Sequence, residues 1–345
     1  MYDIVGKRNL WFTVSAILTI PGLLFIILGG LKPSIDFTGG TEWEVRHAEE
    51  PTSAEMTDAL SELGYDDVVV TSLPDDFLRI RTEPIDLIPP ETDAPAPSAS
   101  ASATDGASAE PSASAEPSAS AEPSESVEPT PAPIAEGTEF ADLEDDLAAQ
   151  FGEGEPRLVR TVGPIIGADL IRSSAVLIII GEIFLLGYLW MRFGFRFGTA
   201  AIVALLHDVI LVVGTFAILG FFFNVEFDAL FVTALLTIIA FSVHDTIVVF
   251  DRIRENRIRH AGESFGAIVN HSILQTMSRS IITSVTVAVT LGALVLLGPP
   301  TIRTFGLALL LGVASGTYSS IFNAAQILVA WQDWDAKRKT RPARS

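Results

Sequence analysis

Hydrophobic residues gather in six long stretches of this chain, separated by polar segments. The first covers residues 9–31 and contains no charged residue. Five more follow after a long polar region, at residues 173–191, 197–220, 229–250, 280–297 and 304–331. Most are close to the ~20 residues that an α-helix needs to cross the hydrocarbon core of a bilayer. The pattern predicts an α-helical polytopic membrane protein with six transmembrane helices.

The first and last hydrophobic stretches differ from the others in position and in length. A cleaved signal peptide would also begin with an apolar segment, but residues 9–31 exceed a typical signal-peptide core and no A-x-A-like site follows. We therefore expect an uncleaved helix. Residues 304–331 are more than one crossing requires, so we expect this helix to tilt or to continue past the membrane surface.

Lys and Arg residues indicate the orientation of the helices. Placing both termini in the cytoplasm puts there the basic clusters at Lys7-Arg8, Arg192 and Arg196, Arg252–Arg259 and in the tail, residues 332–345. By the positive-inside rule, the long segment between the first two helices is then extracytoplasmic. The Arg252–Arg259 cluster also suits contact with anionic lipid or docking of a partner.

The long segment, residues 32–172, has a different periodicity. Alternating, strand-like patterns cover residues 41–46, 68–72, 77–82 and 157–162, and helical patterns cover residues 53–63 and 138–151. Thr52 and Glu55 are spaced for a capping box at the first of these helices. The order β-α-β-β-α-β predicts a small α+β domain of the ferredoxin-like, split-βαβ type.

Charge is concentrated in this segment. The 345 residues include 42 Asp+Glu and 22 Lys+Arg, but residues 32–172 hold 31 of the acidic and 7 of the basic ones. The segment of residues 32–172 therefore carries a net charge of −24, and the rest of the chain carries +4. Its Ala/Ser/Pro/Glu-rich insert, residues 89–133, repeats ASAEPS and is expected to be disordered, with a binding role as the alternative.

Several classes of function are excluded by composition. With no Cys, thiol catalysis and Cys-ligated metals are ruled out, and the acidity argues against a nucleic-acid partner. Five scattered His do not form a metal site. No nucleophile–base arrangement is visible, so we expect no catalytic residues, no cofactor and no enzyme activity. Gly39-Gly40 lacks the G-K-[ST] of a phosphate-binding loop and instead predicts a tight backbone turn, capped by Asp36.

Short blocks along the chain match one known family. The two most specific are Asp36-Phe37-Thr38-Gly39-Gly40 and the run SVHDTIVVFDRIREN, residues 242–256. Weaker blocks are Val5-Gly6-Lys7-Arg8, Leu206-His207-Asp208-Val209, Ser278-Arg279-Ser280 and Tyr318-Ser319-Ser320-Ile321-Phe322. In these blocks the chain resembles the SecF family of bacterial protein-export membrane proteins, within the RND superfamily. His244 stands where the family often has Asn, and the insert is outside its core pattern.

The resemblance implies a specific role. Members of this family pair with SecD, each contributing six helices, and the pair associates with the SecYEG channel in the bacterial cytoplasmic membrane. The pair uses the proton gradient, or sodium in some relatives, to promote export of preproteins, which the extracytoplasmic domains are thought to contact. The family pattern also points to Asp245 and Arg279 as functional positions.

The residues themselves direct attention to the same two positions. Asp245 lies in an otherwise apolar helix, where a charged group is costly and usually faces the protein interior. At ~1.5 Å per residue it lies roughly 26 Å from Asp228, and Arg279 lies about 27 Å from Leu297. The two therefore have similar depth. We hypothesise that Asp245 binds and releases a proton while Arg279, in contact with it, tunes its affinity. The alternative is that both residues lie near the cytoplasmic surface, where Arg279 only snorkels to the headgroups.

Four further polar residues fall within predicted helices. Asp208 belongs either to this proton relay or to a structural hydrogen bond between helices. Its neighbour His207 points about 100° away around the helix, so the two are predicted not to share a face. We expect His244 to be a hydrogen-bonded interior imidazole, and Glu182 is a weak candidate without an assigned role.

Small residues in the last stretch, from Gly306 to Ser320, suit close helix packing against SecD or against this chain's own helices. Two other classes of function compete with the export role. An RND-type proton-coupled exporter of small molecules or lipids would share the intramembrane carboxylates, but such exporters normally have about twice as many spans. A membrane-anchored sensor or scaffold would not need Asp245 and Arg279.

Overall fold

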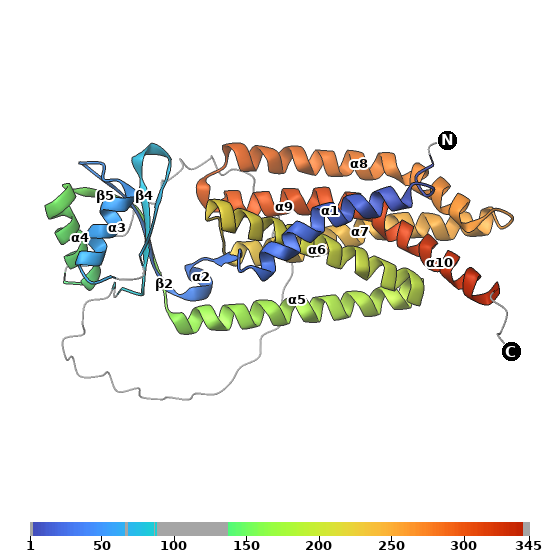
Figure 1. Cartoon of the computed structure of the whole chain (residues 1–345), viewed down its shortest axis with the longest axis horizontal. Coiled ribbons are helices and arrows are strands. Elements are labelled where there is room, and N and C mark those ends of the chain that lie inside the picture. The colour runs from blue at the N-terminus through green and yellow to red at the C-terminus, as the bar shows by residue number, and fades with distance from the viewer. Residues whose placement is uncertain (1–2, 66–67, 86, 88–136, 341–345) are drawn as a thin grey trace, which may run out of the picture. The chain divides into compact units, whose positions relative to one another are not determined.

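The structure is a computed structural model that describes residues 3–65, 68–85, 87 and 137–340 (Figure 1). The insert predicted to be disordered, residues 89–133, lies outside the described residues. Contacts divide the chain into two compact units. Unit 1 comprises Met1–Gly39 and Pro164–Ser345, and unit 2 comprises Gly40–Gly163.

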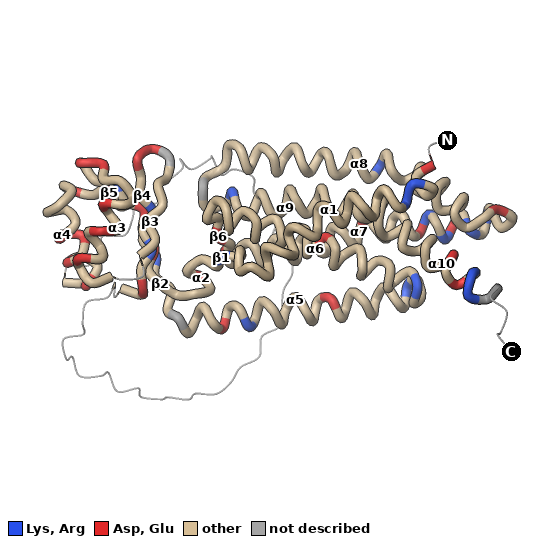
Figure 2. The backbone as a smooth tube through the Cα atoms, in the orientation of Figure 1, with Lys and Arg blue, Asp and Glu red and all other residues tan. Residues whose placement is uncertain are grey.

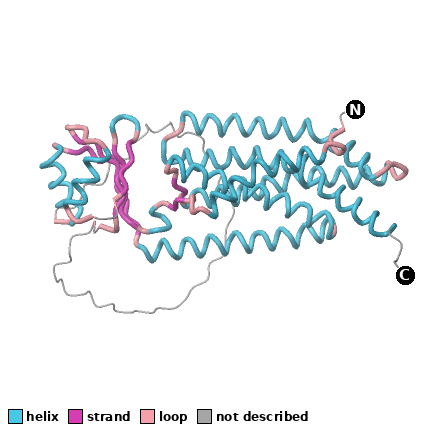
Figure 3. Tube along the Cα trace, in the orientation of Figure 1, coloured by secondary structure: helices cyan, strands magenta, loops and turns pink. Residues whose placement is uncertain are grey.

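Unit 1 is built from six long apolar helices (Figures 1 and 3). Five are continuous: α1 (Arg8–Ile27), α5 (Pro164–Phe193), α6 (Phe195–Phe223), α7 (Ala229–Arg259) and α8 (Phe265–Leu297). The sixth comprises α9 (Pro300–Ser319), a π-helical turn (Ser320–Ala324) and α10 (Ala325–Thr340). All six are long and apolar enough to cross a membrane, as the hydrophobic pattern predicts. The protein is therefore a multi-pass membrane protein.

Several of these helices are longer than the apolar stretches that predicted them. α7 continues to Arg259 and α8 begins at Phe265, although the predicted stretches end at residue 250 and begin at residue 280. Hydropathy detects only the part that suits hydrocarbon, whereas the backbone hydrogen bonds continue through polar residues. Ser264 fixes the start of α8 because its hydroxyl accepts from the amide of Ala267.

Glycines in α1 and just after it allow close approach to α6. A Cβ added to Gly22 would lie 2.8 Å from Gly214 Cα, and one added to Gly30 would lie 2.4 Å from the carbonyl oxygen of Ala217. Only glycines permit backbones to approach so closely, which is how membrane helices gain packing contacts in lipid. In α9, a Cβ at Gly312 would meet the Ile238 side chain of α7, and one at Gly316 would meet Ser242 of the same helix. This part of the small-residue stretch therefore contacts the chain's own helices.

Unit 2 contains a four-stranded antiparallel sheet and two helices (Figure 3). The strands are β2 (Gly40–His47), β3 (Val69–Ser72), β4 (Leu78–Thr82) and β5 (Gly154–Val162), in the order β3-β4-β2-β5. The helices α3 (Ser53–Glu62) and α4 (Glu139–Phe151) pack on one face of the sheet. The core between them is formed by Trp43, Val45, Met56, Leu60, Leu78, Ile80, Phe140, Leu143 and Leu147.

Local sequence signals of unit 2 are confirmed in detail. Thr52 Oγ1 accepts from the amide of Glu55, and the Glu55 carboxylate accepts from the amide of Thr52, which is the predicted capping box. The helix then ends near Gly64, which adopts the left-handed φ of +98°. Between β3 and β4, Asp75 and Asp76 also have positive φ values and make the reversal.

The opposite face of the sheet carries a buried ion-pair network. Glu44 on β2 is 3% exposed and its two carboxylate oxygens accept from Arg79 at 2.7 Å and from Arg157 at 2.5 Å. Burial opposes ionisation of this carboxyl, but the hydrogen bonds and charges of the two guanidinium groups outweigh it. The pKa of Glu44 consequently lies below its ordinary value.

We predict that Glu44→Gln destabilises unit 2 by about 1.5–3 kcal/mol at neutral pH, the range for hydrogen bonds to charged groups. Because folding lowers the pKa of Glu44, its stabilising contribution is complete above the unfolded value of about 4.3 and is lost as the pH falls through the folded value. Wild type and variant should therefore converge in acid. The test is the urea midpoint for unfolding of unit 2, measured at several pH values by limited proteolysis of the full-length protein. Glu155→Gln, at the exposed Arg46 pair, is the control. A wild type–variant difference that persists in acid would contradict the prediction.

Candidate functional site: two buried carboxylates in the helical unit

Asp208 is a fully buried carboxylate on α6 with four polar contacts. Ser315 Oγ donates to its Oδ1 at 2.6 Å, and His207 Nδ1 lies 3.1 Å from the same oxygen. Ser242 Oγ and Ser319 Oγ donate to Oδ2. A carboxylate offers about four lone-pair sites, so this group is fully satisfied. The hydrogen bonds to α7 and α9 that one alternative anticipated are therefore present.

Asp245 on α7 is also buried, as predicted, with 8% of its surface exposed. Ser280 Oγ of α8 donates to Oδ1 at 2.6 Å, and Ser320 Oγ of the π-helical turn donates to Oδ2. Each carboxylate oxygen therefore retains a lone pair that no described side chain occupies. Such a group has room to accept a proton.

Two short connections join the carboxylates. Ser319 and Ser320 are neighbours where α9 enters the π-helical turn, and they donate to different carboxylates. On α7, Ser242 lies one helical turn from Asp245 and donates to Asp208. The two groups thus form one buried cluster of Asp208, Asp245 and the serines at 242, 280, 315, 319 and 320.

No Lys or Arg side chain lies within 4 Å of Asp208 or Asp245 in the part of the chain that the structure describes. The groups in polar contact with the two carboxylates are serine hydroxyls, together with a ring nitrogen of His207. A buried carboxylate without a cationic partner is costly when charged unless enough hydrogen bonds stabilise its charge, and where these are few it is readily neutralised by a proton. Asp245, with one hydrogen bond on each oxygen, can therefore exchange a proton, whereas a closed ion pair would resist this.

The predicted contact between Asp245 and Arg279 is not present. The Arg279 side chain is exposed, and no carboxylate lies within 4 Å of it among the described residues. Ser280, the next residue on α8, faces Asp245 instead. Neighbouring helical residues point about 100° apart, so matching depths left the rotation of α8 undetermined.

Both membrane histidines differ from expectation. His207 does contact Asp208, because its Nδ1 lies at the base of the ring and reaches the adjacent side chain. His244 is exposed on α7 and not an interior imidazole. On α5, Glu182 is half-buried, and its Oε2 has no hydrogen-bond partner among the described residues.

The Asp36–Gly40 block forms a junction with α7. It contains the short helix α2 (Ile35–Thr38), which Ser34 caps by accepting from the Asp36 amide. The Asp36 carboxylate was predicted to cap its own turn, but its Oδ2 accepts from the amide of Ala229, the first residue of α7, at 3.0 Å. Gly39 and Gly40 adopt positive φ values of 76° and 131°, as paired glycines suggested.

Neighbouring contacts reinforce this junction. The Phe37 ring packs on Phe227 with centroids 5.3 Å apart. Beside it, β1 (Lys32–Pro33) pairs in parallel with β6 (Glu226–Phe227), a two-residue ladder that the sequence pattern did not predict. A carboxylate at the start of a helix is favourable. Asp36 therefore ties the segment after α1 to the start of the helix that carries Asp245.

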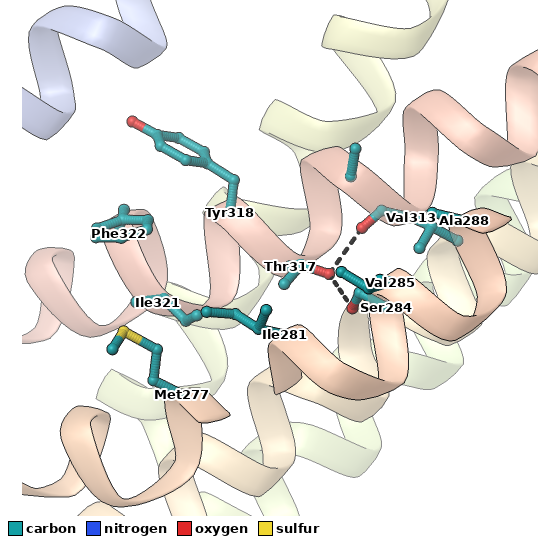
Figure 4. Close-up of a pocket in the computed structure, with 11 residues that line it drawn as sticks. Met277, Ile281, Ser284, Val285, Ala288, Val313, Thr317, Tyr318, Ile321 and Phe322 are labelled. Carbon is teal, nitrogen blue, oxygen red and sulfur yellow. Dashed lines mark hydrogen bonds between the residues drawn. The ribbon is translucent and has the colours of Figure 1, made fainter. Parts of the chain in front are cut away.

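An apolar pocket of about 300 Å³ opens between α8 and α9 (Figure 4). Its lining is almost entirely aliphatic and aromatic, and Thr317 bonds to Ser284 across it. It lacks a charged side chain that could orient a polar ligand. Among the described residues, no group of three or more His, Asp or Glu side chains could hold a metal ion. The carboxylate cluster is therefore the candidate functional site.

The serines were not assigned roles from the sequence. Ser242, Ser280, Ser319 and Ser320 lie within the blocks quoted above, and Ser315 lies in the small-residue stretch. Their signal is the recurrence of hydroxyl residues within apolar helices, which often indicates hydrogen bonds between helices. Which carboxylate each one faces depends on helix rotation and could only be seen in the fold.

Comparisons with known proteins agree with this architecture. Residues 143–334 match the family described as "Protein export membrane protein SecD/SecF, C-terminal". The chain therefore belongs to the SecD/SecF family of protein export membrane proteins.

Individual relatives are similar along nearly the whole chain. A protein translocase subunit SecF of Thermobaculum terrenum is 42% identical over 98% of this chain and 96% of the relative. A SecF subunit of Anaerolinea thermophila is 34% identical over 99% of both. The crystal structure of SecDF from Thermus thermophilus, described as a translocon-associated membrane protein, superposes with a TM-score of 0.73 at 28% identity. That match covers 96% of this chain and 39% of SecDF.

Proposed function

We propose that this protein is a non-enzymatic auxiliary subunit of the Sec protein translocase that uses the proton motive force to promote preprotein export. The observation that carries the proposal is the match to SecF subunits over nearly the full length of both chains. Family membership supports the translocase role, and the carboxylate cluster supports the use of protons.

A SecD subunit is the proposed partner. This chain matches 39% of SecDF, a single chain that carries both names, and this likeness supports SecD as the partner. The SecYEG channel and the translocating preprotein are the further proposed partners, because relatives are named translocase subunits and SecDF is described as translocon-associated.

Asp245 is the proposed proton-binding residue. It is buried, it lacks a cationic partner among the described residues, and its oxygens retain free lone pairs. Arg279 is exposed at the neighbouring position on α8, so its proposed role is to tune Asp245 when helix rotation or a partner subunit brings it closer. The coupling then runs through movement of α8 relative to α7.

We propose the following orientation in the bacterial cytoplasmic membrane. The two ends of the described chain lie at one end of the helical unit, and many of its Lys and Arg residues gather there (Figure 2). The positive-inside rule places that end in the cytoplasm. Unit 2 is then an extracytoplasmic, ferredoxin-like domain, which its β-α-β-β-α-β order and β3-β4-β2-β5 sheet support.

Protease added to inverted vesicles should spare unit 2; cleavage there would refute this orientation.

The test of the function is preprotein translocation into inverted membrane vesicles, with and without a proton gradient. Vesicles depleted of this protein should lose most of the stimulation by the gradient, and the purified protein should restore it. Recovery from native membranes together with SecD and SecYEG is the accompanying expectation. Unchanged translocation, with small-molecule or lipid efflux lost on depletion, would instead establish the exporter alternative.

A further inference from the structure

The two buried carboxylates have unequal surroundings, although both lie in membrane-spanning helices. Asp208 is 0% exposed and Asp245 is 8% exposed. Asp208 has two polar contacts on each carboxylate oxygen, whereas Asp245 has one on each. A proton can therefore bind Asp245 without disturbing a contact, while on Asp208 it would have to displace or turn one of the four contacting groups.

The ring of His207 completes the cage around Asp208. Its Nδ1 lies 3.1 Å from Oδ1, and its Nε2 is buried without a hydrogen-bond partner among the described residues. A buried N–H without an acceptor is rare and costly, so the proton of a neutral imidazole belongs on Nδ1. His207 is then a fourth donor to Asp208.

Asp208 also contacts the π-helical turn. Ser319, which donates to Asp208, is the residue before the turn, and Ser320, which donates to Asp245, is its first residue. π-Helical turns within α-helices are rare and often occur at functional sites. Holding Ser319 on Asp208 fixes the position from which Ser320 reaches Asp245.

We propose that Asp208 does not carry a proton but is a permanently ionised positioning residue, which through Ser319 and Ser320 sets the proton affinity of Asp245. The inference rests on the proposed function, which it deepens by assigning different roles to the two carboxylates. Removing a hydrogen bond from ionised Asp245 makes proton binding more favourable. Loss of the Ser319 anchor should therefore act like loss of the Ser320 hydroxyl.

The charged and titratable groups near the cluster allow this interpretation. His207 on α6 contacts Asp208. His244 on α7 and Arg279 on α8 are exposed, and Glu182 on α5 is half-buried. On the last span Tyr318 bonds to the carbonyl of Trp11. None of the latter four forms a described hydrogen bond or ion pair with Asp208 or Asp245.

The first experiment is infrared spectroscopy of the purified full-length protein in lipid, titrated with acid. A carboxylic-acid C=O band that is missing in Asp245→Asn should remain in Asp208→Asn. A second carboxylic-acid C=O band that is missing in Asp208→Asn but present in Asp245→Asn would show that Asp208 itself takes a proton and would overturn the proposal. The readout does not depend on export, so it separates this inference from the proposed function.

The second experiment measures gradient-dependent export in vesicles, with SecD present, across a range of pH. Ser319→Ala and Ser320→Ala should both keep the stimulation and shift its midpoint to higher pH. The two serine variants remove a hydroxyl group but no charge. They therefore still test the positioning role if Asp208→Asn fails to fold. Asp251→Asn, an exposed carboxylate on α7, is the control and should coincide with wild type. A Ser319→Ala profile that coincides with wild type, beside a shifted Ser320→Ala profile, would refute the positioning role.

Discussion

Replacing Asp245 by Asn is expected to reduce the gradient-dependent part of preprotein export to background while gradient-independent export continues. The amide is nearly isosteric and can keep its hydrogen bonds to Ser280 and Ser320, so the helices should remain packed. What the variant loses is the ability to bind and release a proton. Because no cation lies within 4 Å of Asp245 among the described residues, no partner charge is left buried and unpaired.

Inverted vesicles that contain the variant together with SecD and SecYEG provide the measurement. Export is compared with and without the gradient, at equal amounts of membrane-inserted protein. Asp251→Asn is the matched control because it removes an exposed carboxylate from the same helix, one that pairs with Arg192 at 3.4 Å. Full gradient-dependent export by Asp245→Asn would rule out a proton role for this residue.

A second large effect is expected where α1 crosses α6. A Cβ at Gly214 would lie 2.6 Å from Gly22 Cα, a backbone atom that cannot rotate away. Gly214→Leu must therefore separate the two helices. Overpacking of this kind typically costs about 1–3 kcal/mol, and here the backbone contact favours the upper end.

The melting temperature of the purified protein in detergent tests this, with a decrease of about 2–4 °C expected for each kcal/mol. Gly187→Leu on α5 is the control, since a Cβ there would meet no atom within 4 Å. The chain contains no Cys, so a disulfide between cysteines introduced in α1 and α6 can report the separation directly. Equal melting temperatures for the two variants would show that the close approach is not needed for stability.

Much of the fold could be predicted from local patterns. The six helices follow from apolar stretches, and the Thr52–Glu55 capping box follows from two residues three positions apart. Burial of Phe140, Leu143 and Leu147 follows from helical spacing. These features depend on interactions among residues near in sequence, or on the preference of a segment for hydrocarbon. The two-residue pairing of β1 with β6 joins segments far apart in the chain and has no such local signal.

The candidate site could be predicted only in part. Asp245 and Asp208 are conspicuous as carboxylates in apolar helices, whichever way those helices turn. The partner of Asp245 could not be predicted from the sequence. Arg279 and Ser280 are adjacent on α8, and a rotation of α8 by about 100° about its axis decides which of them faces Asp245. Asp36 likewise has a local turn available, but its carboxylate reaches the start of α7, a contact that needs the tertiary fold.

Local sequence patterns were enough to identify a membrane protein of six helices with an additional α+β domain, and to show which intramembrane residues are ionisable. Hydropathy and periodicity depend only on residues that are neighbours in the sequence, so they can be evaluated without knowledge of the fold. Only the tertiary structure decided that serines and not Arg279 surround Asp245, and that Asp208 is the more completely enclosed carboxylate. Those distinctions depend on the rotation and depth of packed helices, which side-chain contacts across the whole bundle determine together.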